Sequence, residues 1–248
     1  MCMLLTGCGT GKTATFRQDK VYAVRLDTTT WFDAVRNRVI PVALYIPETH
    51  EQIPHQGVVI FSHGYGQNKG GDYLAYSYLI RFLALHGYFV ASIQHELATD
   101  SLMPVTGIPQ IVRRPFWERG AANILYCLNT LKRLHPELDY TCVTLIGHSN
   151  GADMTALFAQ QHPERVQKIV ALDNRRMPLP RTSKPRVLSL RSSDQPADPG
   201  VLPTPEEQKK FRIRIVKLPA TTHNEMDDHA NEVQRKEIND LILAFLRL

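Results

Sequence analysis

An alternation of short apolar runs with helical stretches constrains the fold of this chain more than any other feature of its sequence. The run GVVIFSHG at 57–64 is continuously apolar and rich in β-branched residues, and a helical pattern follows it over 73–87. Such runs are typical of strands that helices cover on both faces, because a half-exposed strand would alternate with polar residues. The same reasoning predicts strands over 88–94, 142–149, 166–173, 186–194 and 211–219, and helices over 116–134, 152–162 and 228–247. The sequence therefore predicts an α/β domain with a mostly parallel, doubly wound sheet.

The beginning of the chain has a different pattern. The segments 21–26 and 40–47 are short apolar runs around a polar connection, which predicts two antiparallel strands before the parallel ones. No internal linker follows, so we expect residues 20–248 to form one domain, with 1–19 as a separate N-terminal segment. The longest irregular piece, 95–115, is too short for a separate cap domain, although long loops are often functional.

A serine lies between two glycines where one predicted strand ends and a helix begins. The motif Gly147-His148-Ser149-Asn150-Gly151 matches G-x-S-x-G, and its context of strand, turn and helix is the one that gives this motif chemical meaning. A turn this sharp strains the serine backbone and brings chain segments close together, which explains small residues on both sides. Ser149 is therefore a candidate nucleophile, with free backbone N–H groups at the helix start to stabilise negative charge.

A serine nucleophile needs a histidine as general base. In strand–turn–helix sites of this kind the histidine follows the serine in the chain, and only His162, His223 and His229 do so. His223 lies after the last predicted strand and before the last helix, so it is the predicted base, whereas the other two are expected to be surface or capping residues. A metal site formed by His223, Asp227 and His229 is not expected, because no helical pair of histidines spaced four apart is present.

The carboxylate that would orient this histidine has two candidates. Asp173 and Asp194 both follow apolar runs, and both fall at the carboxyl ends of predicted strands, where sites in open parallel sheets are built. Spacing alone leaves both open.

The loop after the first parallel strand, Ser62-His63-Gly64-Tyr65-Gly66, is expected to approach the serine. Its glycines allow close backbone contact with a ligand. We expect the backbone N–H groups of Tyr65 and Asn150 to form an oxyanion hole, with His63 as a structural residue.

Four segments resemble the platelet-activating-factor acetylhydrolase-like serine esterases of the α/β-hydrolase superfamily. These are VVIFSHGYG, LALHGYFVASIQHE, VTLIGHSNGAD and IVALDNRRMP, in the order and spacing of that family, and the likeness extends over roughly 20–230. The resemblance implies an α/β-hydrolase fold. It also implies that the catalytic acid follows the strand after the nucleophile helix, with a proline five positions later, which favours Asp173 with Pro178.

By the same resemblance the site comprises Ser149, Asp173 and His223, and it needs no metal or other cofactor. The implied activity is hydrolysis of short- to medium-chain carboxylic esters through an acyl-enzyme. A serine amidase or peptidase could use the same triad, and a non-catalytic binding protein could have the same fold.

The chain departs from that family directly after Asp173. Aromatic residues of the family are replaced by Asn174, Arg175 and Arg176. We expect the two arginines to form surface salt bridges, and the alternative is that they pair with an anionic substrate.

Composition limits the partners of this chain. A net charge of +5 comes from scattered basic residues without a long basic run, so a small-molecule ester is the expected partner and nucleic acid is not. The segment LTGC at 5–8 resembles a bacterial lipobox, preceded by only four residues. Residues 1–19 are therefore predicted to be a truncated lipoprotein signal and tether, with Cys8 anchoring the protein at the bacterial envelope or its periplasmic side. Without that anchor we expect a cytoplasmic protein, and the oligomeric state is left open.

Overall fold

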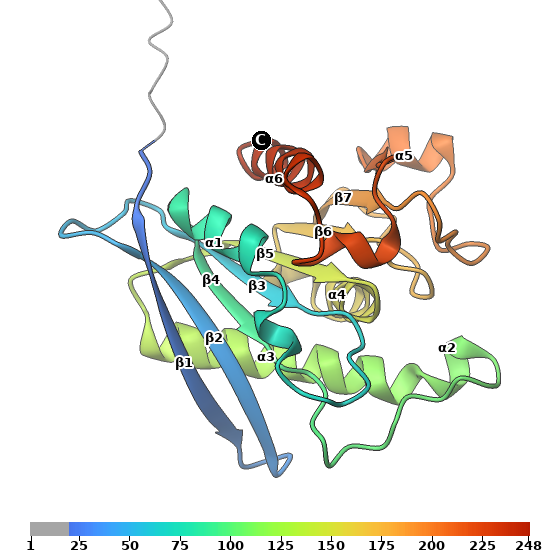
Figure 1. Cartoon of the computed structure of the whole chain (residues 1–248), viewed down its shortest axis with the longest axis horizontal. Helices are drawn as coiled ribbons and strands as arrows, with labels where there is room; N and C mark the ends of the chain where they lie inside the picture. The colour runs from blue at the N-terminus through green and yellow to red at the C-terminus, as the bar shows by residue number, and fades with distance from the viewer. Residues whose placement is uncertain (1–19) are drawn as a thin grey trace, which may run out of the picture.

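The structure is a computed structural model that describes residues 20–248, and it contains an eight-stranded sheet with helices on both faces (Figure 1). The order of strands across the sheet is β1-β2-β4-β3-β5-β6-β7-β8. The pairs β1–β2 and β2–β4 are antiparallel, and every later pair is parallel, so the predicted mostly parallel sheet with an antiparallel start is confirmed. The strands have the following bounds: β1 Ala23–Asp33, β2 Arg38–Glu48, β3 Gly57–Ser62, β4 Phe89–Ile93, β5 Asp139–His148, β6 Lys168–Leu172, β7 Arg186–Arg191 and β8 Arg214–Lys217.

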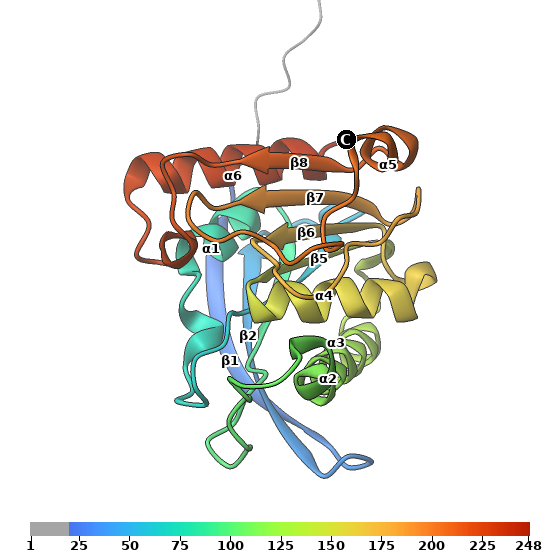
Figure 2. The ribbon, with the colours of Figure 1, turned by 90° about the vertical axis from the view of Figure 1, so that its right-hand side faces the viewer.

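Helices cover the sheet on both sides because the parallel strands are apolar on both faces. Figure 2 shows α6 on one side of strands β5 to β8, with α4 and α3 on the other. One apolar core joins the sheet to α3 and α4 and includes Trp117 and Phe158, and the other joins it to α1 and α6 and includes Leu79 and Ile242. Each such fully buried side chain contributes roughly 1.5–3 kcal/mol through its removal from water. The α-helices have the following bounds: α1 Ser77–Leu85, α2 Pro109–Val112, α3 Arg114–Leu134, α4 Asn150–Gln161, α5 Pro205–Phe211 and α6 Glu232–Leu246.

The structure adds elements that the apolar pattern does not show. The antiparallel strands are longer than predicted, because the exposed β1 continues through a polar, threonine-containing stretch that an apolar run does not reveal. Helices α2 and α5 were not predicted, since both have fewer than eight residues and neither buries an apolar stripe. The start of α5 nevertheless carries a capping box between Thr204 and Glu207.

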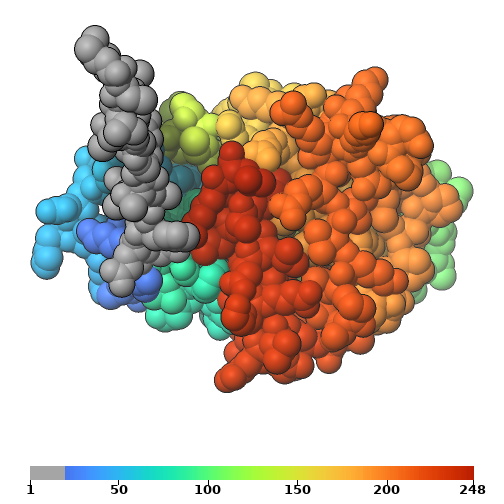
Figure 3. Space-filling view, turned by 90° about the horizontal axis from the view of Figure 1, so that it is seen from above, coloured from blue at the N-terminus to red at the C-terminus, as the bar shows by residue number. Residues whose placement is uncertain are grey.

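The parallel strands end at a common edge, and the segments around that edge position the site. The C-terminal part of the chain, red in Figure 3, lies between the N-terminal strands and the region of α5. The long loop after β4 is held to β2, because Arg38 donates to both carboxylate oxygens of Asp100 at 3.0 and 2.8 Å and to the His95 carbonyl at 2.6 Å. This loop therefore has a fixed place beside the edge.

Within residues 20–248 no helix has the length and apolar character needed to cross a bilayer. The predicted anchor residue Cys8 lies outside the described residues.

Candidate active site

Ser149 occupies a strained turn between β5 and α4. Its φ of 51° and ψ of −119° place a residue with a side chain in a region that is costly for any residue except glycine. The turn is tight because Gly147 and Gly151 approach other backbone closely. A Cβ on Gly147 would lie 2.4 Å from the Gly151 carbonyl oxygen, and one on Gly151 would lie 2.2 Å from the Ser62 carbonyl oxygen at the end of β3. The two glycines of the motif therefore allow β3, β5 and α4 to meet at the serine.

The side chains of Ser149, His223 and Asp173 form one continuous chain of hydrogen bonds. The Ser149 Oγ lies 2.9 Å from His223 Nε2, and His223 Nδ1 lies 2.5 Å from Asp173 Oδ2. His223 begins the short 3₁₀ turn η3 (His223–Met226), which follows β8 and returns over the sheet edge. The structure thus brings together the three residues that the sequence predicts, from three separate segments.

Asp173 is fully buried and held in its charged form. It accepts hydrogen bonds from the Ser192 backbone N–H at 3.0 Å and from the Ser192 hydroxyl at 2.6 Å, and Arg191 lies 3.0 Å from Oδ1. Burial alone would raise the pKa of Asp173, but the hydrogen bond from His223, the charge of Arg191 and the bonds from Ser192 together hold that pKa below its ordinary value. An ionised carboxylate at this position fixes the N–H of His223 on Nδ1 and leaves Nε2 free to accept a proton.

The second candidate acid, Asp194, contacts the backbone of His223 and not its ring. Asp194 is exposed, and its Oδ1 accepts the backbone N–H of His223 at 2.7 Å. Asp194 therefore holds the loop that carries His223, whereas Asp173 contacts the ring.

A second buried hydrogen-bond network connects both sides of the serine. The Gly64 N–H donates to the Tyr76 hydroxyl at 3.1 Å, and this hydroxyl lies 2.7 Å from His148 Nδ1. On its other side, His148 Nε2 lies 3.0 Å from the carbonyl oxygen of His223. Because a carbonyl oxygen only accepts, Nε2 carries the proton and Nδ1 accepts from Tyr76.

This network ties the glycine loop after β3 to the segment of the predicted base. Burial, followed by the nearby His223, lowers the pKa of His148 to about 3, so His148 is neutral at ordinary pH.

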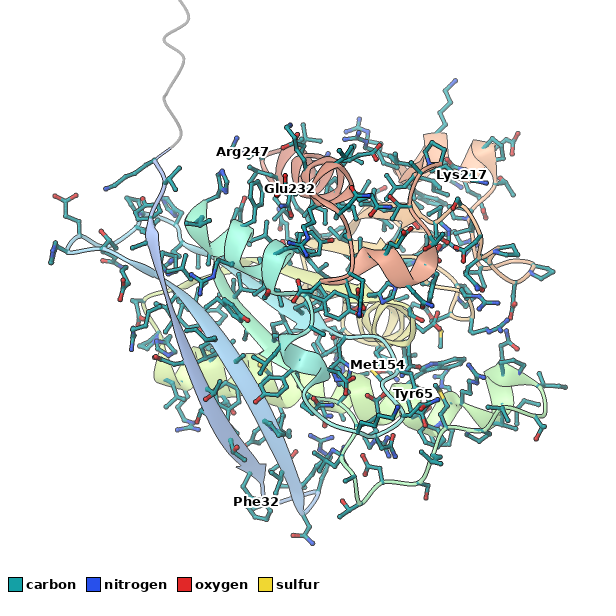
Figure 4. The ribbon with its side chains drawn as sticks, in the orientation of Figure 1. Phe32, Tyr65, Met154, Lys217, Glu232 and Arg247 are labelled. Atoms are coloured by element: carbon teal, nitrogen blue, oxygen red, sulfur yellow. The ribbon has the colours of Figure 1, made fainter. Side chains whose placement is uncertain are left out.

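The residues predicted to donate to the oxyanion, Tyr65 and Asn150, line the same hollow as Ser149. Asn150 is the first residue of α4, so its backbone N–H has no carbonyl within the helix to bond. Its side chain is fixed from both ends, because Trp117 Nε1 donates to its Oδ1 at 2.8 Å and its Nδ2 donates to Glu96 Oε1 at 2.9 Å. Tyr65 lines the space around Ser149, and its hydroxyl accepts the Met103 N–H at 2.9 Å. Figure 4 shows Tyr65 between α4 and the end of α3 that adjoins α2.

The other histidines considered as bases lie elsewhere. His63 is fully buried, its Nε2 accepts the His95 N–H at 2.9 Å, and its Nδ1 lies 2.6 Å from the Gly64 carbonyl oxygen. Both ring nitrogens of His63 thus have backbone partners. His162 caps the C-terminal end of α4, and the exposed His229 contacts Asp227 at 2.8 Å instead of Ser149. Among residues 20–248 no group of three potential ligands is arranged to hold a metal ion.

Two hollows meet at Ser149 and Tyr65. The first, of about 200 Å³, is bounded by the loop after β4 and the loop after β6, through Met103, Val105 and Arg175 among others. The second, of about 220 Å³, contains His223 together with acidic residues.

The two arginines after Asp173 differ from each other. Arg176 forms the predicted surface salt bridge, with Asp198. Arg175 forms none within the described part of the chain, and its Nε is buried without a hydrogen-bond acceptor. The surface salt-bridge prediction is therefore right for Arg176 and wrong for Arg175.

Comparison with known proteins places the geometry in a structural class. No protein-family model matches this chain, and no curated protein matches its sequence. Solved structures match over nearly the whole length of this chain. The chain has the α/β-hydrolase fold.

Three of these matches show how far the likeness extends. A fungal esterase from Rhizomucor miehei has a TM-score of 0.64 at 15% identity, over 92% of this chain and 83% of its own. A dienelactone hydrolase-like promiscuous phosphotriesterase from metagenomic libraries has a TM-score of 0.66 at 17% identity, over 91% of this chain and 98% of its own. A bacterial heroin esterase has a TM-score of 0.61 at 13% identity, over 94% of this chain and 86% of its own. At these identities the likeness shows the α/β-hydrolase fold alone.

Several residues that support this α/β-hydrolase site were not predicted from sequence. Arg191 and Ser192 hold Asp173, Tyr76 and His148 link the loops, and Trp117 fixes Asn150. Only His148 carried a sequence signal, as a residue inside the G-x-S-x-G motif. The others are distant in sequence and gain their roles through packing.

Proposed function

We propose that this protein is a serine hydrolase that cleaves carboxylic esters through an acyl-enzyme. The observation that carries the proposal is the hydrogen-bonded chain from Ser149 Oγ through His223 to the buried Asp173, built on a strained turn at the start of a helix. Backbone strain of this kind is costly and persists only where the surrounding structure enforces it, which is typical of functional sites and not of an ordinary surface serine.

The proposed reaction follows from the direction of these hydrogen bonds. His223 Nε2 takes the proton of Ser149 as Oγ forms a bond to the ester carbonyl carbon, and Asp173 stabilises the resulting imidazolium. The N–H groups of Tyr65 and Asn150 stabilise the oxyanion, a contribution of about 3 kcal/mol for each donor. His223 then returns the proton to the departing alcohol, and a water molecule cleaves the acyl-enzyme by the same steps to release the acid and regenerate Ser149.

The size of the site favours short acyl groups. The first hollow measures only about 200 Å³, which is small for a ligand pocket and suits a short acyl group better than a long chain. A membership among platelet-activating-factor acetylhydrolase-like esterases is supported by the four sequence motifs and by the Asp173 and Pro178 spacing. We extend the proposal to short- and medium-chain esters of small alcohols, and to a lipid tether through Cys8 at the bacterial envelope.

Labelling by a fluorophosphonate and hydrolysis of p-nitrophenyl acetate test this proposal together. The wild type should show both, and Ser149→Ala should lose both. Ser193→Ala, which changes an exposed serine outside the hydrogen-bonded chain, serves as the matched control and should keep both.

Three outcomes would contradict the proposal in different ways. A wild-type protein that reacts with neither reagent would favour a non-catalytic binding protein with this fold. Labelling that persists in Ser149→Ala would place the nucleophile elsewhere. Faster turnover of anilides than of matched esters would favour the amidase alternative.

A further inference from the structure

The hollow between the loops after β4 and β6 is positively charged. Arg113, Arg175 and Arg176 line it together with Ser149, and we call it the arginine pocket. The three side chains line one hollow of about 200 Å³, so their guanidinium groups lie near one another. Burial and the charges of Arg176 and Arg175 lower the pKa of Arg113, although Asp153 and Asp198 oppose this shift. Bringing these three positive charges together costs free energy, because they repel one another.

The carboxylates of the protein do not neutralise this cluster. Asp198 pairs with Arg176, while Arg113 Nε donates to the Pro104 carbonyl oxygen at 3.1 Å. The side chain of Arg175 has no hydrogen-bond or ion-pair partner within residues 20–248, and its Nε is buried.

One further carboxylate lines the pocket, but backbone groups occupy one of its oxygens. Asp153 Oδ1 accepts the N–H groups of Arg176 at 3.0 Å and Met177 at 2.8 Å. Three arginines therefore face two carboxylates, and the guanidinium of Arg175 remains available. The unpaired Arg175 guanidinium beside Ser149 can therefore bind an anionic group of a substrate, because charge-assisted hydrogen bonds to a carboxylate are strong.

The position of His223 indicates which part of an ester would enter the arginine pocket. The base returns its proton to the departing alcohol, so the alcohol must lie on the side of His223. His223 lines only the second hollow, where Asp72 and Asp227 are the neighbouring acids. The arginine pocket also borders Ser149 but does not include His223, so it would then receive the acyl group.

We propose that the preferred substrates are half-esters of short dicarboxylic acids, whose free carboxylate binds Arg175 with support from Arg113. This inference rests on the proposed esterase function. The carbonyl carbon bonds to Ser149 Oγ, the alcohol leaves with the proton from His223, and water releases the dicarboxylate, so no further reactant is needed. The pocket volume of about 200 Å³ suits acyl chains of four or five carbons.

Two esters of equal shape test the charge requirement. Monoethyl succinate and ethyl 4-methylpentanoate differ only in a carboxylate that replaces an isopropyl group. The wild type should have a kcat/KM at least tenfold higher for monoethyl succinate. Arg175→Gln should lower the ratio of the two kcat/KM values roughly tenfold to a hundredfold, the range for hydrogen bonds to a charged group.

Two further variants sharpen the test. Asp153→Asn keeps the oxygen that accepts the backbone N–H groups but removes a negative charge, so it should raise the ratio. Arg133→Gln removes an exposed arginine at the far end of α3 and should leave both the ratio and the activity unchanged. A similar fall of the ratio in Arg133→Gln and Arg175→Gln would contradict a local effect.

Labelling of Ser149 by a fluorophosphonate separates the two proposals. If Ser149 is labelled but monoethyl succinate neither reacts preferentially nor protects it better than the neutral ester, the charge inference is overturned and the serine hydrolase stands. If Ser149 is not labelled and neither ester reacts, the proposed function fails and the inference fails with it.

Discussion

Replacing Asp173 by asparagine is the most informative perturbation of this site. The aspartate has two acceptor oxygens, which contact His223 Nδ1 at 2.5 Å, the Ser192 hydroxyl at 2.6 Å, the Ser192 N–H at 3.0 Å and Arg191 at 3.0 Å. Asparagine has only one acceptor oxygen. If that oxygen faces the Ser192 N–H, the amide NH₂ faces His223 and forces Nδ1 to accept. The proton of His223 then moves to Nε2, which can no longer take the proton of Ser149.

The expected loss follows from this change of tautomer. We expect kcat/KM for p-nitrophenyl acetate to fall about 10⁴-fold, the loss measured for such a substitution in a triad, which corresponds to about 5.5 kcal/mol. A second effect falls on stability, because the buried Arg191 loses its counter-ion. Breaking a buried pair costs about 3 kcal/mol, so urea unfolding of Asp173→Asn must be measured to show that the protein is folded in the assay.

Asp194→Asn is the matched control. The asparagine oxygen can still accept the His223 N–H, so we expect kcat/KM to fall less than tenfold. Near-normal activity in Asp173→Asn, or a 10⁴-fold loss in Asp194→Asn, would refute the assignment of the acid.

Two further predictions concern stability. Gly151→Ala should lower the free energy of unfolding by about 3 kcal/mol or more, because the new Cβ would lie 2.2 Å from the Ser62 carbonyl oxygen. Gly200→Ala, where a Cβ meets nothing within 4 Å but φ is 79°, should cost only about 1–2 kcal/mol, and an equal cost in urea unfolding would contradict the steric argument. His148 has a folded-state pKa of about 3, below the ordinary 6.5, so the unfolded state binds more protons as pH falls and the folded state loses stability. Between pH 7 and pH 5 this contribution amounts to about 2 kcal/mol, and His148→Gln should lack it in urea unfolding at the two pH values; an unchanged pH dependence would show that His148 is not buried in its neutral form.

Local sequence patterns were sufficient for the framework of the fold. Continuous apolar runs and intervening helical stretches predicted the parallel strands, because the period and length of such segments depend on neighbouring residues alone. The turn at Ser149 was predictable for the same reason, since strand, glycines and helix lie within a few residues. The short helices α2 and α5 were missed, because a helix of four or seven residues without a buried stripe leaves little periodic signal.

The sequence by itself determined the fold class, the serine turn and the histidine that follows the last strand. Tertiary structure alone shows which carboxylate contacts that histidine. Asp173 and Asp194 follow neighbouring strands at the same edge, but the buried Asp173 lies against the ring of His223, whereas the exposed Asp194 accepts its backbone N–H. It also shows that Arg176 is paired and Arg175 is not. Contacts of this kind join residues from separate strands and loops, so their geometry is set by packing and is absent from the spacing of residues along the chain.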